Sequence, residues 1–212
     1  MLRKNKIKKD LKLKNVYVVT SSIACGKSTF LNYARKNGIF CINADEISNI
    51  VFRYKSKQIA KKLKICNSDF KFLSLKDKKK LVASIVFKDK ILKKKLEKIM
   101  HSKIKKEIIK KIKNSKHKII FVEIPLYFEN RNYNFLLNKI VIYCPYDLSL
   151  KRLMSRNNLS LDEAKLRLNS QLNIEEKIKH ATYLIKNDDN LEDFKENSLK
   201  LIKNLKEKHG IS

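Results

Sequence analysis

A glycine, a lysine and two hydroxyl residues, Gly26-Lys27-Ser28-Thr29, begin seven residues after the apolar run Val16 to Val19. The phosphate-binding loop pattern G-x-x-x-x-G-K-[ST] uses these residue types: its backbone N–H groups hold phosphates, its lysine reaches the β and γ oxygens and its hydroxyl binds Mg²⁺. Gly26, Lys27 and Ser28 fit the second half of the pattern, whereas Ser21 stands where its first glycine belongs. The spacing predicts a site for ATP and Mg²⁺.

We call residues 21–28 the P-loop. Five of its residues, together with Thr29 directly after it, are expected to contact the nucleotide: Ala24, Cys25, Gly26, Lys27, Ser28 and Thr29. Lys27 would neutralise the β and γ phosphates, Ser28 would bind Mg²⁺, and Cys25 would contribute only its backbone amide. The competing interpretation is an ordinary strand-to-helix turn, with Ser21 or Ser22 as N-cap and Lys27 on the surface. The chain has only three glycines and one is spent at position 26, which favours the P-loop.

Strands and helices alternate along the chain in the order needed to position such a loop. Buried strands are predicted at five apolar runs: Val16 to Val19, Ile39 to Ile42, Ile119 to Val122, Ile140 to Tyr143 and Tyr183 to Ile185. Continuous apolar runs are typical of parallel strands covered on both faces. The first helix is expected to end at Gly38. The pattern predicts an α/β fold with a five-stranded parallel sheet flanked by helices.

Two helical insertions are predicted between strands. In the first, about residues 50–118, an apolar stripe follows one long helix through Leu92, Leu96, Met100, Ile104, Ile108 and Ile112. In the second, Ser160 and Glu163 form a capping-box signature for a helix that runs to about Asn169. A final helix is expected over about Leu191 to Lys208, with Phe194, Leu201, Ile202 and Leu205 toward the core.

Composition limits the possible function. The 212 residues suffice for one core with a small appended subdomain. The first thirteen residues are basic and lack the apolar segment of a signal peptide, and no apolar run approaches the roughly 20 residues of a membrane span. A soluble cytoplasmic protein without membrane partners is therefore expected. The four cysteines, Cys25, Cys41, Cys66 and Cys144, lack zinc spacing and are expected to be reduced, mostly structural thiols.

The net charge of +29 is the strongest bulk feature. It admits a nucleic-acid surface, because dense lysine neutralises phosphates. It also admits nucleotide bias, since Lys, Asn and Ile share A/T-rich codons, and the even spread of lysines favours this explanation over a nucleic-acid partner. In a chain where nearly every cation is lysine, an arginine marks a place where a planar guanidinium is useful. Three of them, Arg152, Arg156 and Arg167, fall within sixteen residues of one another.

Further segments match one family in order. The chain reads "INADEI" after the second strand, "HSKI" at 101–104, "FVEIPLYFE" at 121–129 and "KRLMSRNNLSLDEAKLRLNSQ" at 151–171. With the P-loop they resemble the dephospho-CoA kinase family, which phosphorylates dephospho-CoA with ATP in the last step of coenzyme A synthesis. The resemblance implies a nucleotide-binding core (14–50, 115–152 and 178–208), a helical acceptor subdomain (51–114), a lid (153–177) and a basic N-terminal extension (1–13).

The resemblance also implies residue roles on the acceptor side. Asp45 matches the base for the ribose 3′-hydroxyl, and Asp45, His101 and Arg167 would contact dephospho-CoA. From the residues alone, Asp45 is equally an N-cap of the helix that follows, and a lone histidine on a helix is as often structural. Glu123 ends an apolar strand and would join Ser28 in binding Mg²⁺, against the alternative of a partly exposed strand end.

On the nucleotide side, Arg152 and Arg156 reproduce the lid arginine pair, which would clamp the phosphates; Arg156 is placed with Lys27 and Asp45 among the catalytic residues. A solvated helix face is the alternative for Arg152. Arg167 and Gln171 would share one face of the following helix. Asn187, in a segment 187–189, matches the adenine loop.

The sequence departs from the family pattern in the P-loop, and two other functions compete with the kinase interpretation. Ser21 and Ala24 replace loop glycines, so the loop must keep negative φ there or carry strain. The expected protein is a monomer whose partners are ATP and dephospho-CoA. One rival is a P-loop nucleoside or nucleoside-monophosphate kinase; another is a basic nucleic-acid-binding protein with a degenerate loop.

Overall fold

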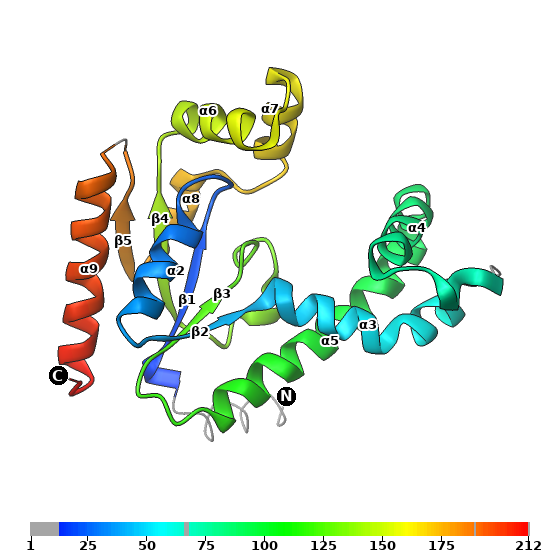
Figure 1. Cartoon of the computed structure of the whole chain (residues 1–212), viewed down its shortest axis with the longest axis horizontal. Coiled ribbons are helices and arrows are strands. Elements are labelled where there is room, and N and C mark those ends of the chain that lie inside the picture. The colour runs from blue at the N-terminus through cyan, green and yellow to red at the C-terminus, as the bar shows by residue number, and fades with distance from the viewer. Residues whose placement is uncertain (1–12, 66–67, 189, 212) are drawn as a thin grey trace. The chain divides into compact units, whose positions relative to one another are not determined.

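The computed structural model describes residues 13–65, 68–188 and 190–211 (Figure 1). Twelve of the thirteen residues of the basic N-terminal extension, together with Cys66 and Asp189, lie outside these ranges. Within them the chain forms one five-stranded sheet of order β2-β3-β1-β4-β5, in which every pairing is parallel. The strands are β1 (Val16–Ser21), β2 (Phe40–Asn43), β3 (Ile120–Glu123), β4 (Asn138–Tyr143) and β5 (Tyr183–Lys186).

All five predicted strands are confirmed, with bounds within two residues of the expected runs. Every residue of β1 and β3 is buried, because these strands have neighbours on both sides and helices on the faces of the sheet. Phe30 of the following helix stacks on Phe121 of β3, with ring centroids 5.6 Å apart. The core therefore lies around β1, directly beneath the P-loop.

The sheet belongs to a compact unit comprising residues 1–43 and 112–212. Its helices are the short turn η1 (Leu13–Asn15), α2 (Lys27–Lys36), η3 (Arg131–Tyr133), α6 (Tyr146–Asn157), α7 (Leu161–Asn169), α8 (Ile174–Ile178) and α9 (Leu191–Lys208). Helix α2 packs on α9, α9 on β5, and α8 on β4. Helices α6 and α7 follow β4 and extend past the carboxyl end of the sheet, beyond the loop between β1 and α2 (Figure 1).

Three sequence signals for helix ends are confirmed. Gly38 has φ +79° just after the end of α2, as a C-terminal glycine requires. Ser160 and Glu163 form the capping box of α7, which ends at Asn169. The last helix has the predicted bounds and buries Phe194, Ile202 and Leu205.

A second compact unit covers residues 44–111 and is entirely helical apart from its connections. It contains α3 (Ala44–Lys62), η2 (Ser68–Phe72), α4 (Leu75–Lys88) and most of α5 (Lys90–Asn114). The apolar stripe of α5 is buried at Met100, Ile104, Ile108 and Ile112 and partly buried at Leu92 and Leu96. In the described ranges no helix is long and apolar enough to cross a membrane.

Candidate active site

A cavity of about 850 Å³ opens at the carboxyl ends of the strands in the first unit. Such a position, outside the carboxyl ends of parallel strands, is where open α/β sheets bind ligands. The wall combines the P-loop, helix α6, and the segments that follow β3, α7 and β5. The residues around it are 21–29, Pro125, Lys151, Arg152, Ser155, Arg156, Gln171, Asn187, Leu191 and Phe194. The predicted nucleotide-binding residues therefore surround one cavity.

Gly26 is required on two independent grounds. Its φ is +92°, a left-handed conformation that residues with a Cβ adopt only under strain. A Cβ at this position would also collide with Nδ2 of Asn187, which is held in place by its hydrogen bond to the Cys25 carbonyl. No side chain caps the helix that Gly26 precedes, so backbone N–H groups of the first turn of α2 are left for an anion.

The interpretation of the loop as an ordinary capped turn is wrong. Gly26 occupies the N-cap position of α2, whereas Ser21 is the last residue of β1. The Ser21 hydroxyl donates to the carbonyl of Ser22 at 2.8 Å and so takes no part in capping α2. Ser28 is exposed in the first turn of α2 and Thr29 is partly buried beside it.

Asn187 fastens the P-loop to the segment after β5. Its Nδ2 donates to the carbonyl of Cys25 at 2.9 Å, and its backbone N–H donates to Tyr143 at 2.8 Å. Arg152 donates from Nη1 to the backbone carbonyl of Asn187 and from Nη2 to its Oδ1, both at 3.3 Å. Arg152 is therefore half-buried and engaged with the loop after β5, and the alternative of a solvated helix face is wrong for it.

Lys27, at the start of α2, and Glu123, at the end of β3, form an ion pair. The Lys27 ammonium donates to Oε1 of Glu123 at 2.7 Å, with side chains 17% and 9% exposed. Glu123 ends β3 and stands in register with Val19 of β1 and Asn43 of β2. The alternative of a partly exposed strand end is wrong for Glu123. Because an ammonium has three donors, this contact holds Lys27 in place and leaves capacity for a phosphate oxygen.

Ala24 carries the strain that its glycine-like position predicts. Its φ is +61°, in the left-handed region, whereas Ser21 remains in β1 with ordinary strand geometry. Of the two glycine replacements noted in the sequence, only Ala24 therefore has a conformational cost, of about 1 kcal/mol.

Replacing Ala24 with glycine should raise the free energy of unfolding by about 1 kcal/mol, because glycine adopts positive φ without the Cβ clash. Urea unfolding measures it. Ala60→Gly, inside helix α3, is the matched control and should lower the free energy of unfolding by about the same amount. A loss of stability in both variants would show that Ala24 is unstrained.

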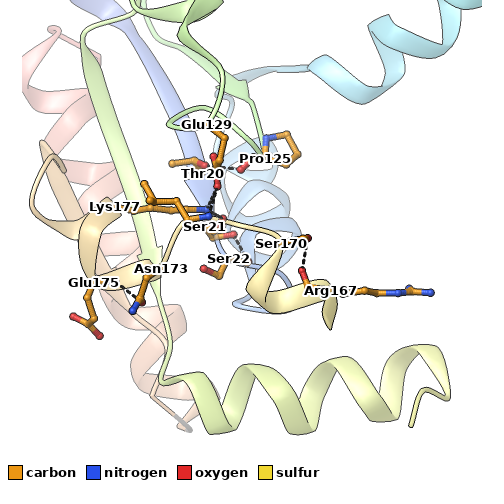
Figure 2. A network of polar contacts seen from close by, with 11 residues as sticks. Thr20, Ser21, Ser22, Pro125, Glu129, Arg167, Ser170, Asn173, Glu175 and Lys177 are labelled. Atoms are coloured by element: carbon orange, nitrogen blue, oxygen red, sulfur yellow. Dashed lines mark hydrogen bonds and ion pairs between the residues drawn. The ribbon is translucent and has the colours of Figure 1, made fainter. Parts of the chain in front are cut away.

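Arg156 and Arg167 differ in their surroundings. Arg156 lines the cavity from α6 and is exposed, with its Nε donating to Oδ1 of Asn157 at 3.0 Å. Arg167 is exposed on α7, and Figure 2 shows its side chain extending away from the neighbouring polar network. The shared helix face predicted for Arg167 and Gln171 is wrong, because α7 ends at Asn169 and Gln171 lies in the segment beyond it. Gln171 instead lines the cavity.

Asp45 and His101 belong to the second unit. Helix α3 begins at Ala44, so Asp45 is exposed inside the first turn and the N-cap alternative is wrong; Asn43 precedes the helix. A carboxylate in the first turn is favoured by the helix dipole. His101 is partly buried on α5. Their roles toward the acceptor remain predictions.

Lys177 was missed by sequence reasoning, although its side chain is fully buried. From α8 its ammonium contacts Oε1 of Glu129 at 2.9 Å and donates to the carbonyl of Ser21 at 3.3 Å (Figure 2). The same carboxylate oxygen accepts from the backbone N–H of Leu172 at 2.9 Å. The pair thus joins the start of the P-loop to the segment after β3 and to the chain returning from α7. The only sequence signal related to this pair was its partner Glu129, the last residue of "FVEIPLYFE".

Five parallel strands in this order, with a glycine–lysine loop leading into a helix at the carboxyl end of the central strand, define the chain as an α/β protein of the P-loop kinase type. The protein family described as dephospho-CoA kinase matches residues 16–193. The chain belongs to the dephospho-CoA kinase family.

Individual relatives agree along nearly the whole chain. A dephospho-CoA kinase of Campylobacter jejuni (strain RM1221) is 42% identical over 198 residues, covering 91% of this chain and 98% of that protein. The solved structure titled dephospho-CoA kinase from Campylobacter jejuni is 40% identical, covers 92% of this chain and 98% of its own, and superposes with a TM-score of 0.71. The structure of TT1252 from Thermus thermophilus is 26% identical and covers 89% and 96%, with a TM-score of 0.77.

Proposed function

We propose that this chain transfers the γ-phosphoryl group of ATP to the ribose 3′-hydroxyl of dephospho-CoA, and that the cavity around the P-loop holds the nucleotide. The observation that carries the proposal is the ammonium of Lys27, fixed by Glu123 beside the uncapped start of α2. Phosphoryl transfer requires little besides positioning and neutralisation of charge, and this arrangement offers both. Family membership supports the acceptor.

Each residue has a distinct task in this proposal. The backbone N–H groups around Gly26 bind phosphate oxygens, and Lys27 stabilises the charge that builds up on the transferring group. Arg156 adds a second cation from α6. Asp45 accepts the proton of the 3′-hydroxyl as the phosphoryl group moves, while His101 and Arg167 contact the acceptor. Arg152 and Asn187 hold the wall of the cavity.

The oxygen donors at the site fit magnesium. Within the described residues there is no group of three or more His, Cys, Asp or Glu side chains able to hold a metal ion. Mg²⁺ in such enzymes needs few protein ligands, because phosphate oxygens and water complete its shell. The Ser28 hydroxyl and the Glu123 carboxylate are the side chains that would hold it. When bound, Mg²⁺ neutralises charge on the β and γ phosphates.

The segment 153–177 begins inside α6 and contains α7. We propose that it closes over the nucleotide, because water would otherwise compete for the phosphoryl group. We further propose that the protein acts in the cytoplasm as a monomer. Helix α7 begins with a side-chain cap from Ser160, so it keeps its local structure as the segment moves, whereas α8 at the end of the segment stays anchored through the buried Lys177.

Release of ADP by the purified protein should depend on dephospho-CoA. A coupled assay with ATP and Mg²⁺ compares dephospho-CoA with nucleosides and nucleoside monophosphates at equal concentration. The proposal expects turnover with dephospho-CoA and a product that carries one additional phosphate on the 3′-oxygen. Faster turnover with a nucleoside monophosphate would assign the protein to a different kinase activity.

Asp45→Asn should lower kcat by about 100-fold, because a positioned general base contributes a factor of this order, while the Michaelis constant for ATP stays near that of the wild type. Glu46→Gln is the matched control, since Glu46 is the other acid in the first turn of α3 and is also exposed. It should retain wild-type turnover. Equal losses in both variants would point to helix stability in place of base catalysis.

A further inference from the structure

Two cysteines that are 119 residues apart in the sequence meet beneath the P-loop. The Sγ atoms of Cys25 and Cys144 are 2.7 Å apart, and both residues are 1% exposed. Cys25 directly precedes Gly26, and Cys144 directly follows β4. Two sulfur atoms at this distance are closer than ordinary contact and face one another, so a bond between them requires only a small movement of either side chain.

The surroundings of the two sulfurs are unequal. Hydrogen bonding from the Cys144 thiol, with further hydrogen bonds from Ser149 and Ser22, lowers the pKa of Cys25 despite its burial. The same interaction with Cys25, together with burial, raises the pKa of Cys144. Cys25 also lies at the N-terminal end of α2, a position that favours a thiolate. Cys25 is therefore the nucleophile of the pair and Cys144 the partner that resolves it.

We propose that Cys25 and Cys144 are a redox-active pair that a peroxide converts to a disulfide beneath the P-loop. The Cys25 thiolate attacks one oxygen of hydrogen peroxide, which forms a sulfenic acid and, after protonation, releases water. The sulfur of Cys144 then attacks the Cys25 sulfur, loses its proton and displaces a second water as the disulfide forms. The two thiols are oxidised by two electrons and the peroxide is reduced to two waters. A dithiol reverses the reaction by exchange.

The route to the pair runs through the nucleotide cavity. Cys25 and Cys144 are both buried in the core cluster with Ile142 and Ile185, but only Cys25 also lines that cavity. A small oxidant therefore reaches Cys25 first, in agreement with its role as nucleophile. This part rests on the proposed function, because a nucleotide in the cavity should shield Cys25.

The disulfide would tie a residue of the phosphate-binding loop to the end of β4. Ala24, the residue before Cys25, has a strained positive φ, and Asn187 holds the carbonyl of Cys25 from the other side. A covalent link at Cys25 removes the remaining freedom of the loop to adjust to phosphates. We expect the oxidised protein to have a kcat/KM for ATP about tenfold lower than the reduced protein, since small displacements of binding groups cost this much or more.

The test uses a Cys41→Ser/Cys66→Ser protein, in which only Cys25 and Cys144 remain. After treatment with hydrogen peroxide and alkylation of free thiols, intact mass should show the loss of two hydrogens and no alkylation. Digestion without reductant should join the peptides that contain residues 25 and 144. A non-hydrolysable ATP analogue at saturation should slow the cross-link by about tenfold, in proportion to the unoccupied fraction of the cavity. Dithiothreitol should restore both free thiols and turnover.

A Cys144→Ser variant in the same background is the matched control and should instead accumulate higher oxides of Cys25. Sulfinic acid at Cys25 without a cross-link in the parent protein would overturn the proposal, as would a disulfide that forms only in urea. If the disulfide formed without any change in kcat/KM for ATP, the proposed restriction of the P-loop by the disulfide would be wrong. Formation of the cross-link is scored first in samples without nucleotide, so a failure of the proposed kinase activity would be seen separately.

Discussion

Replacing Lys27 with methionine should lower kcat/KM for phosphoryl transfer by about 1,000-fold, or about 4 kcal/mol of transition-state stabilisation. Methionine keeps an unbranched side chain that is one atom shorter and removes the charge. The loss follows from the position of Lys27. This lysine is the first residue of α2, and its ammonium lies 2.7 Å from a carboxylate oxygen of Glu123. Most of the loss should appear in kcat, because the charge acts mainly on the transferring group. Steady-state kinetics with dephospho-CoA measures it.

Lys36→Met is the matched control, because Lys36 is exposed at the other end of the same helix. It should keep wild-type kinetics. Circular dichroism of Lys27→Met should show a folded protein, and adding Glu123→Gln should remove any instability caused by an unpaired buried carboxylate. If Lys27→Met kept a tenth of the wild-type kcat/KM or more, the main role in charge stabilisation proposed for the P-loop lysine would be wrong.

Lys177→Met should lower the free energy of unfolding by about 3 kcal/mol, the lower end of the range for breaking a buried ion pair from one side. Lys177 is fully buried, whereas its partner Glu129 is 22% exposed and would be partly hydrated once alone. The Ser21 carbonyl would also lose a donor. Urea unfolding measures the change, and the dependence of the free energy of unfolding on urea concentration is compared between variants.

The double variant Lys177→Met/Glu129→Gln should be more stable than Lys177→Met alone, because no unpaired charge remains near the P-loop. Lys179→Met is the matched control: Lys179 pairs with Glu176 on the surface, with both side chains about half exposed or more, and its loss should cost under about 0.5 kcal/mol. Equal losses for Lys177→Met and Lys179→Met would show that the buried pair has no special weight in the fold.

Local signals predicted most of the elements. The strands appeared as apolar runs and the capping box of α7 as a four-residue spacing, because both patterns depend on near neighbours in the sequence. Gly26 and Lys27 were found for the same reason. The error at Gln171 has a local cause as well: the helical spacing from Arg167 held in the sequence, but α7 ends at Asn169.

Contacts between distant segments were not predictable in this way. Lys177 is one of many lysines in the sequence, and nothing near it shows that its ammonium reaches Ser21, 156 residues away. The meeting of Cys25 with Cys144 and of Asn187 with Cys25 likewise depends on the order of strands in the sheet. Because lysines are spread evenly along the chain, the sequence did not distinguish the buried Lys177 from the exposed ones.

The contact between Asn187 and the P-loop has a consequence for synthesis of the chain. The loop at Gly26 is made early, yet its backing comes from Asn187 and Phe194, which lie far later in the sequence and are synthesised long after it. Until β5 joins the edge of the sheet beside β4, the phosphate cradle lacks one wall. Nascent chains should therefore gain the ability to retain ATP only after the segment that contains Asn187 and Phe194 has emerged from the ribosome, which makes nucleotide capture a reporter of completion of this wall.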